Sequence, residues 1–598
     1  MLITLLSWCL ITFYAISIGI VLSVAFNRLF NIKITRIDTY IIVGMMGLTV
    51  YAGLFSVIYK VGLLANLILL ASSCLILLSG TVRRKWGEVY GSLRASYLTN
   101  PLIPKCIILA ILLIVALYVG SGIETFYDTE LYHAQAIRWI EEYGIVKGLG
   151  ILHSRFSYNS CFMPLQALFG FKWLFGIELH SVNAYLAFVL SAWAILTQSA
   201  WDKRGFLPAD GLKCILLIFT WIFELSSLSS PNSDYFALSM AIYIVANLTE
   251  DISSLVSSSS DADNRSTLVT DFILYSFIAV YAVSLKLSVA LVVLVALYPA
   301  YYLIMNKQWK QIACCIGIGL VIILPYFIRN YYISGYLVYP YTQIDIFDVN
   351  WKVTKSLADY DRREIMTWGK SLNDAELYNY TLRQWFPIWW SHVPHIYRRI
   401  LEAAFILIAG ACLKCALYIF SKKKTYAGNL LVYMYTVSAA MLAMWFLSAP
   451  LLRYGMVFAL MIPGMFVGDM LSVLSTNAQQ LKLNSVLRYI QNAVPAISAA
   501  VCLIAAVLFL RTQSINPVMP AQYQHIDNHS KQIDNVTIYY ALEGTDWVGY
   551  HDFPAIPYEP DPACLGIVDS NDISKGFWNA EVYESKDSTT QKPYLDLE

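Results

Sequence analysis

Residues 127–139 read YDTELYHAQAIRW and gather two carboxylates, a histidine and an arginine within 13 positions. The almost purely apolar stretch LAILLIVALYVG ends a few residues before them. A carboxylate can act as a general base, and a cation beside it can bind a phosphate. The stretch is therefore either a capped surface helix or one wall of an active site at a membrane face.

The same stretch has the pattern of a helix. Apolar side chains recur at intervals of three, at Leu131, Ala134, Ile137 and Ile140. This spacing predicts an amphipathic helix over 129–143 that lies on the membrane surface, with Gly144 after its end. Asp128 or Thr129 would be the N-cap, and Glu130 would lie in the first turn, where negative charge is favoured. Helix capping alone thus explains both carboxylates.

The composition indicates a polytopic membrane protein. Of the 598 residues, 58% are hydrophobic and 14% are charged, against about 25% charged in a typical soluble domain. The mean hydropathy is +0.57, and apolar runs of about 20 residues recur, each long enough to cross a bilayer. The net charge of +1 indicates no nucleic-acid partner. The 11 cysteines lie mostly in apolar runs and are expected to be small core residues.

The apolar runs predict about 14 transmembrane helices. They lie near residues 2–26, 39–59, 61–80, 105–122, 179–200, 212–229, 235–249, 270–285, 287–305, 311–328, 400–420, 427–448, 453–474 and 493–511. The first run has no basic leader and no small-residue cleavage site, so we expect a retained span. A further segment, 160–177, either spans the membrane or is re-entrant.

Basic residues set the expected orientation, because loops rich in Lys and Arg stay in the cytoplasm. Such loops lie at 81–105, 201–213, 306–310 and 421–424. If all four are cytoplasmic, 160–177 does not cross the membrane. The segments expected outside are then 123–178, 230–234, 329–399, 449–452 and the tail from 512. The acidic residues that follow the run 105–122 lie outside as well.

This topology divides the chain into regions. They are an N-terminal transmembrane hairpin region (1–104), a transmembrane core with the first outside loop 123–178 (105–328), an aromatic outside loop (329–399), C-terminal transmembrane helices (400–511) and a small outside tail (512–598). Short surface helices are expected in the aromatic loop, for example in DRREIMTWGK. Strands and turns are expected in the tail, at YYALEG and ISKGFW.

Ionisable residues from separated segments meet at one face in this topology. They are Asp128, Glu130, His133, Arg138, His153, Arg155, Asp234, Lys286, Arg329 and Arg453. Simpler explanations exist: Asp234 as a helix cap, Lys286 as a side chain that reaches the interface, and the terminal arginines as anchors. Together the residues suit a sugar or phosphate on a lipid tail, because carboxylates activate a hydroxyl and cations neutralise a phosphate. No HExxH, GxxxxGK[ST] or G-x-S-x-G motif supports zinc proteolysis, ATP hydrolysis or acyl-serine chemistry.

The block DTELYHAQAIRWIEEYGIVKGLGILHSRFSYNS (128–160) resembles the signature of a poorly characterised family of bacterial polytopic membrane proteins. More distantly, the arrangement resembles the GT-C superfamily of membrane glycosyltransferases, which take sugars from polyprenyl-phosphate donors on the extracytoplasmic face. Asp128 matches by position the acid of the first outside loop, and Asp234 matches that of the second. RNYYISGYLVYP (329–340) is similar to an Arg-Asn…Gly-x-x-x-Tyr-Pro stretch of related transferases. Three spans (2–26, 39–59 and 61–80) precede the span that leads into the first outside loop, where many relatives have only that one span, and the three would be an N-terminal addition.

The resemblance implies an all-α, GT-C-like protein of the bacterial inner membrane whose site faces the periplasm or exterior. It implies inverting transfer of a sugar to a glycan, lipid or protein acceptor, with Asp128 as general base. Lys286, Arg329 and Arg453 would stabilise the departing lipid phosphate. Glu130 or Asp234 would orient the acceptor or bind a divalent cation, Mg²⁺ or Mn²⁺, for which Asp128 and Asp234 are the candidate ligands.

Two other functions stay open from the sequence. A polymerase or ligase of the O-antigen type resembles this chain in span number and in its large outside loop, but relies on Arg and His instead of an outer Asp. A transporter of lipid-linked glycans would perform no covalent chemistry. Transporters commonly show internal repeats and charges at the midplane, whereas here the charges gather at one face and no repeat is visible.

Overall fold

The computed structural model describes residues 1–99, 102–124, 126–202, 205–255, 261–476, 484–510, 516–561 and 564–580. Within these ranges nine helices are long and apolar enough to cross a membrane, or ten if α3 (Leu63–Leu77) and α4 (Gly80–Ser96), which meet at 93°, form one span. The nine are α1 (Leu2–Phe30), α2 (Ile37–Ile58), α5 (Leu102–Gly120), α13 (Asp261–Leu285), η7 (Leu287–Ala296) continued by α14 (Leu297–Met305), α15 (Trp309–Ser334), α18 (His395–Phe420), α19 (Tyr426–Ser448) and α20 (Leu452–Thr476). The predicted mostly helical, membrane-embedded architecture is confirmed.

The predicted count of about 14 spans is not confirmed, because five predicted segments are not among the nine. They correspond to α3, α10 (Val182–Leu196), α11 (Pro208–Ile218), α12 (Asp234–Ser254) and α21 (Asn484–Leu510). α10 has 15 residues and so measures only about 22 Å, against a hydrocarbon core of about 30 Å. α11 gives way to a π-helical turn, η4 (Phe219–Phe223), and a 3₁₀ turn, η5 (Leu225–Leu228).

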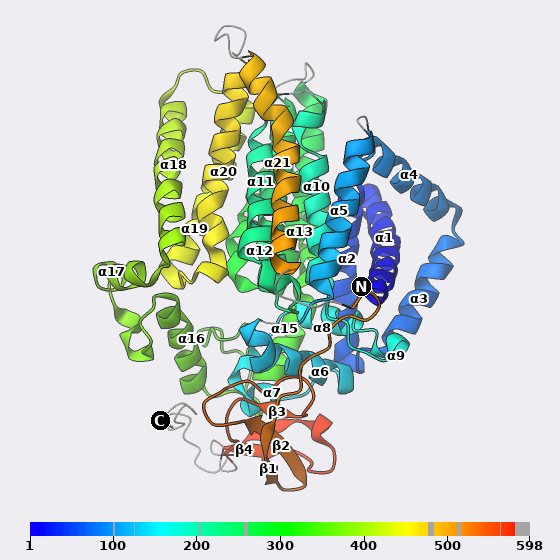
Figure 1. Ribbon diagram of the computed structural model, residues 1–598, viewed down its shortest axis with the longest axis vertical. Helices are drawn as coiled ribbons and strands as arrows, with labels where there is room; N and C mark the ends of the chain where they lie inside the picture. Colours follow the sequence, from blue (N-terminus) through cyan, green and yellow to red (C-terminus); the bar gives the residue numbers. More distant parts are fainter. Residues whose placement is uncertain are drawn as a thin grey trace.

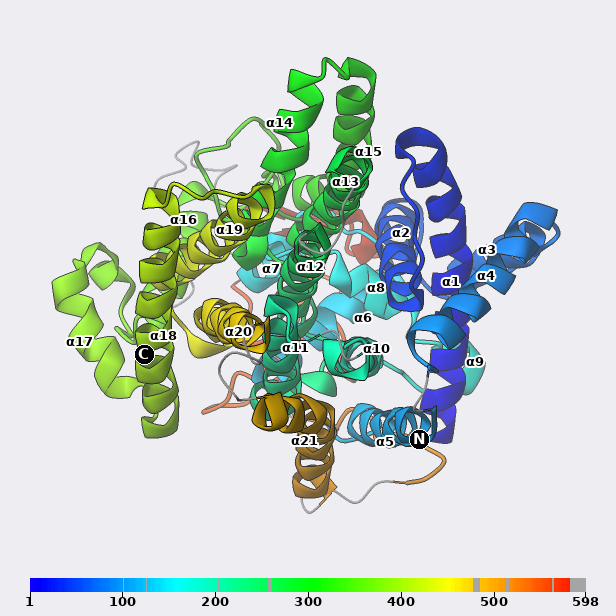
Figure 2. The ribbon, with the colours of Figure 1, turned by 90° about the horizontal axis from the view of Figure 1, so that it is seen from above.

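Helix α12 lies at the centre of the bundle, between α11, α10, α13 and α20 (Figure 2). Every side chain from Asp234 to Thr249 is buried. A helix enclosed on all sides meets no lipid, so it tolerates polar residues that a lipid-facing span would not. The modest hydropathy of α12 therefore follows from its position.

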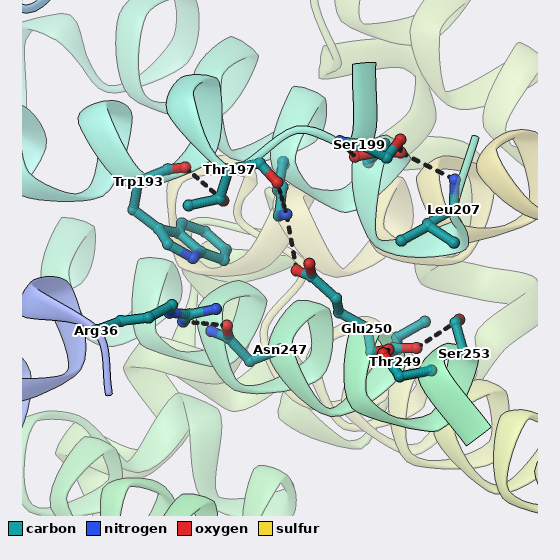
Figure 3. Close-up of polar contacts among 12 residues, drawn as sticks. Arg36, Trp193, Thr197, Ser199, Leu207, Asn247, Thr249, Glu250 and Ser253 are labelled. Atoms are coloured by element: carbon teal, nitrogen blue, oxygen red, sulfur yellow. Dashed lines mark hydrogen bonds and ion pairs between the residues drawn. The ribbon is translucent and has the colours of Figure 1, made fainter. Parts of the chain in front are cut away.

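A polar network ties α12 to its neighbours at the end that carries Glu250 (Figure 3). The Lys213 ammonium donates to the Glu250 carboxylate and to the carbonyl oxygen of Thr197, both at 2.8 Å. Arg36, just before α2, donates to Asn247 on α12. These pairs satisfy buried charges within the protein, and they lie at the opposite end of α12 from Asp234.

The segment predicted to be the first outside loop forms short elements. They are η1 (Thr129–His133), α6 (Ala134–Glu142), α7 (Leu149–Leu152), η2 (Ser154–Ser157), α8 (Phe162–Leu168) and α9 (Lys172–Phe175). Neither α8 nor α9 is long enough to cross a bilayer. The predicted amphipathic helix exists, but Ile137 and Ile140 are buried and α6 packs on α8. Its apolar face therefore lies on protein and not on the membrane surface as expected.

The aromatic loop and the tail also contain regular structure. The loop contains α16 (Lys355–Gly369), η8 (Ala375–Asn379) and α17 (Leu382–His392). The tail contains β1 (Asn528–Ile533), β2 (Val536–Ala541), β3 (Ala555–Ile556), β4 (Leu565–Ile567), η9 (Ile573–Lys575) and β5 (Phe577–Asn579). β1 pairs antiparallel with β2, which pairs parallel with β3; β4 pairs antiparallel with β5. The strands expected at YYALEG and ISKGFW are thus present.

These elements gather at one end of the bundle. In Figure 1, α6, α7, α16 and the tail strands all lie below the long helices, while the α18–α19 connection lies at the top. Helices α5, α11, α13, α15 and α19 run down to this lower end, and α12 and α20 start from it. The first outside loop, the tip between α13 and η7, and the start of α20 are therefore neighbours.

We predict that Gly44→Val destabilises the N-terminal helix pair. A Cβ atom at Gly44 would lie 1.8 Å from the carbonyl oxygen of Ala15, because α1 and α2 touch there through their backbones. Forced separation of packed helices should cost about 1–3 kcal/mol and lower the melting temperature in detergent. Gly317→Val in α15 is the matched control, since a Cβ there meets no atom within 4 Å. Equal melting temperatures for the two variants would contradict this packing.

Candidate functional site

A cavity of about 630 Å³ lies where the end of the bundle meets α16 and the tail. This volume is in the usual range for small-molecule sites, about 300–1,000 Å³. The cavity brings together seven of the ten predicted site residues: Asp128, His133, His153, Arg155, Asp234, Lys286 and Arg453. Apolar side chains such as Leu152, Met163, Leu285 and Leu451 form much of the remaining wall.

Asp128 pairs with Arg453 across the cavity wall. The Asp128 Oδ2 atom lies 2.9 Å from the Arg453 Nη2 atom. Asp128 precedes the π-helical turn η1 but makes no side-chain capping hydrogen bond, so capping does not explain its carboxylate. The guanidinium also lies 5.5 Å from the centre of the Phe126 ring. The pair joins the first outside loop to the start of α20.

Asp234 pairs with Lys286 on the same wall. The amide of Asp234 donates to Asn232 Oδ1 at 3.0 Å, so Asn232 binds the first amide of α12 and the Asp234 carboxylate is available to Lys286. Lys286 is the single extended residue, with φ −158° and ψ 132°, between α13 and η7. The tight tip holds the ammonium inside the protein, where it faces Asp234 and not the interface.

The two ion pairs share one aromatic neighbour. The Lys286 ammonium lies 4.6 Å from the centre of the Tyr454 ring, and the Arg453 guanidinium lies 5.1 Å from it. Both distances are within the range of a cation–π contact. A phosphate placed beside Tyr454 would therefore meet two cations and compete with the two carboxylates for them.

Two histidines line the cavity as neutral rings. Burial lowers the pKa of His133 to about 4, and burial together with the nearby Arg155 lowers the pKa of His153 to about 3. Among the described residues, His133 Nδ1 and His153 Nε2 are buried without a hydrogen-bond partner. At neutral pH each ring therefore has one nitrogen free to donate to, or accept from, a hydroxyl.

Sequence reasoning missed the wall that α16 contributes. Asp361 and Glu364 line the cavity from α16, and burial raises the pKa of both carboxyls. Arg155 Nη2 lies 2.6 Å from Glu364 Oε2, and the Tyr339 hydroxyl donates to Asp361 at 2.6 Å. The signal was available, because two acids three positions apart share one helix face.

Tail residues Asp546, Ile556, Tyr558 and Glu559 also line the cavity, and nothing in their local sequence indicated that they would.

The three remaining predicted residues have other contacts. Arg138 donates to the carbonyl oxygen of Tyr550 at 2.6 Å and stacks on the Phe553 ring, so it binds the tail. The Glu130 carbonyl oxygen accepts from two tail amides, and its buried Oε2 atom has no partner among the described residues. Arg329 is buried and donates to Ser56 Oγ at 2.7 Å and to Asn159 at 3.1 Å.

The cavity does not fit a resident divalent cation. Such a cation needs several oxygen ligands, and the candidate ligands Asp128 and Asp234 are each paired with a basic side chain. In the part of the chain that the structure describes, no group of three His, Cys, Asp or Glu side chains is placed to hold a metal ion.

Comparison with known proteins identifies one family whose model matches this chain. The model of a family described as a domain of unknown function (DUF8201) matches residues 1–460. No curated protein and no solved structure matches the chain. The matched region includes seven cavity residues that the sequence predicted, and the tail lies outside it.

We predict that Arg138→Ala loosens the tail. The variant removes a charged donor to the Tyr550 carbonyl oxygen and a stacking contact 4.7 Å from the Phe553 ring centre. A hydrogen bond from a charged group contributes about 1.5–3 kcal/mol, so hydrogen exchange over 549–556 should accelerate at least tenfold. The control is Arg399→Ala, whose exposed side chain pairs with Glu402 on its own helix. Unchanged exchange in Arg138→Ala would show that the tail is held elsewhere.

We predict a pH-dependent effect of Glu130→Gln. Burial raises the pKa of Glu130 to about 7, whereas the unfolded side chain titrates at about 4.3. The folded protein then binds more protons between these values, so the free energy of unfolding falls as pH rises through this window. The glutamine variant does not titrate and so does not lose this free energy of unfolding. Its melting temperature should therefore exceed that of wild type at pH 8 and equal it at pH 4.

Thermal unfolding at the two pH values measures this effect. Glu543→Gln, at an exposed glutamate of the tail, serves as the control and should leave the difference between the two pH values unchanged. A Glu130→Gln protein that melts below wild type at pH 8 would mean that the carboxylate is stabilising, contrary to the geometry.

Proposed function

We propose that this chain, which belongs to the DUF8201 family, is a membrane glycosyltransferase. It would transfer a sugar from a polyprenyl-phosphate-linked donor to a cell-envelope acceptor. The observation that carries the proposal is the placement of two acid–base pairs, Asp128–Arg453 and Asp234–Lys286, in one cavity at the end of an apolar bundle. A lipid-linked sugar phosphate needs both chemistries, apolar surface for its tail and cations for its phosphate.

The reaction is a displacement at the anomeric carbon. The acceptor oxygen forms a bond to this carbon while the bond to the donor phosphate oxygen breaks, which inverts the configuration. The acceptor proton passes to the Asp128 carboxylate, which acts as general base. The departing phosphate gains negative charge, and Lys286 and Arg453 are the cations beside Tyr454 that would stabilise it.

Arg453 would link donor binding to activation of the base. Without donor, its guanidinium pairs with Asp128 at 2.9 Å. A donor phosphate would compete for the same guanidinium, because bidentate Arg–phosphate pairs are strong. Asp128 would then be free to accept the proton of the acceptor hydroxyl. Donor binding would thus precede base activation.

The site would face the periplasm or exterior of the bacterial inner membrane. Basic loops at 201–213, 306–310 and 421–424 follow or precede the ends of helices that point away from the cavity. Since basic loops stay in the cytoplasm, the cavity end would be extracytoplasmic. Polyprenyl-phosphate donors would then reach the cavity from the outer leaflet.

A polymerase or ligase of the O-antigen type is the second candidate. His153 and Arg155 line the same cavity as Asp128, and this type of enzyme relies on such Arg and His groups. A transporter is less favoured, because the predicted ionisable residues that line the cavity gather at one end of the bundle, whereas transporters commonly bind their substrates near the membrane midplane. Comparing variants of the acid with variants of the basic residues separates the two enzymes.

We predict that Asp128→Asn lowers the rate of sugar transfer by about 10²–10⁴-fold, the usual contribution of a general base. The isosteric amide keeps the size of the side chain but cannot accept the proton. Transfer would be measured in nanodiscs from undecaprenyl-phosphate-linked sugars to an envelope glycan fraction. Thermal unfolding would verify that the variant is folded.

Asp527→Asn is the matched control, since this carboxylate is exposed in the tail and should leave transfer unchanged. Full activity of folded Asp128→Asn protein would exclude Asp128 as the base. Activity that survives Asp128→Asn but is lost in both Arg453→Ala and His153→Ala would favour the polymerase or ligase.

A further inference from the structure

The cavity has two sides of different chemistry. On the bundle side, Lys286 and Arg453 supply the cations. The tail side consists of residues of α16 and the tail together with Arg155 of η2: the acids Asp361, Glu364, Asp546 and Glu559 and the bases Arg155 and Arg362. Lys531 of β1, outside the cavity, pairs with Glu559 at 2.7 Å, so four acids against three bases leave a small excess of negative charge there. A phosphate would therefore be favoured on the bundle side and disfavoured on the tail side.

Exposed aromatic rings border the tail side. Tyr127 is 45% exposed, Trp368 is 52% exposed and Tyr558 is 40% exposed, although all three line the cavity. Large apolar side chains left in water at a cavity commonly mark a binding surface. Their flat faces suit the C–H faces of a sugar ring, and Asp546 and Glu559 are acceptors for its hydroxyls.

Polar atoms without partners face the same region. His153 Nε2 and the Tyr158 hydroxyl are buried and lack a hydrogen-bond partner among the described residues, and both residues line the cavity. The His153 ring lies 6.3 Å from the Tyr558 ring. Buried polar atoms are normally satisfied, so these two groups are suited to the hydroxyls of a bound molecule. The neutral His153 ring attracts no anion.

The tail is attached beside the proposed base. The Tyr127 hydroxyl donates to Asp546, and the amides of Val548 and Gly549 donate to the Glu130 carbonyl oxygen at 2.9 and 3.0 Å. Residues 127 and 130 flank Asp128 in the chain. A molecule held by Asp546 and Tyr558 therefore lies next to the residue that would take its proton.

We infer that the C-terminal tail builds an acceptor subsite on the tail side of the cavity, and that this subsite takes the end of an uncharged saccharide. The inference rests on the proposed function and specifies the chemical class of the acceptor, which the transfer reaction alone does not determine. It also assigns the two parts of the site to different regions of the chain. The acid–base pairs lie within the family match and the acceptor surface lies partly outside it.

The test separates acceptor recognition from donor recognition. Tyr558→Ala and Asp546→Asn, made in the full chain, should each raise the KM for an envelope oligosaccharide fraction about tenfold, as expected for loss of a binding hot spot. Both should bind undecaprenyl phosphate as wild type does, in a thermal-shift titration. The same oligosaccharides should quench tryptophan fluorescence of wild type, through Trp368, and quench it less in the two variants.

Trp309→Ala and Asp527→Asn are the controls. Trp309 is exposed at the start of α15 and Asp527 is exposed in the tail, and neither lines the cavity. Unchanged KM in both test variants, or an equal loss of lipid-phosphate binding and transfer, would overturn the inference. The inference would also be overturned if the variants raised the KM for a peptide acceptor and no oligosaccharide binding were detected. Failure of wild type to bind undecaprenyl phosphate would instead refute the proposed function, and oligosaccharide quenching would still report on the tail.

Discussion

The need to pair the carboxylates of Asp128 and Asp234 at the end of the bundle is the constraint on which this structure depends. A charge left alone near hydrocarbon is costly, so Asp128 and Asp234 must each find a cation. Their partners, Arg453 and Lys286, come from the start of α20 and from the tip between α13 and η7. Pairing therefore fixes helices that are distant in sequence against one another, and it leaves a cavity between them.

Helix α6 shows how the loop region and the tail are joined. Its apolar side chains Ile137 and Ile140 pack inward, toward α8 and the main core. Its polar side chains Gln135, Arg138 and Glu141 bind backbone or hydroxyl groups of residues 549–555. A residue such as Arg138, which looked like a ligand for substrate, is thus explained by a partner within the chain. The pattern predicts the amphipathic helix, but it does not predict which part of the protein each face of the helix contacts.

The local sequence was enough to predict the spanning helices and most of one cavity wall. Apolar runs identify long helices because lipid imposes length and composition together, and this held for α1, α2 and α15. It failed for α10 and α12, which are enclosed by protein: α10 is apolar but has only 15 residues, and α12 has 21 residues but is less apolar. Asp128, Asp234 and Lys286 were predicted because each ionisable residue ends or interrupts an apolar run. Asp546 and Tyr558 were not, since their place in the cavity depends on how a polar tail folds back, which no local pattern encodes.

The two π-helical turns, η1 and η4, have a consequence for comparing relatives. A π turn holds one more residue than an α turn, and both turns lie next to acids, η1 after Asp128 and η4 before Glu224. Each residue advances a helix by about 100°. A homologue that lacks one residue between positions 128 and 134 would carry its carboxylate round to another side of the helix. Such a deletion, small enough to be lost in an alignment gap, would separate the acid from the arginine and open the ion pair that joins this segment to α20.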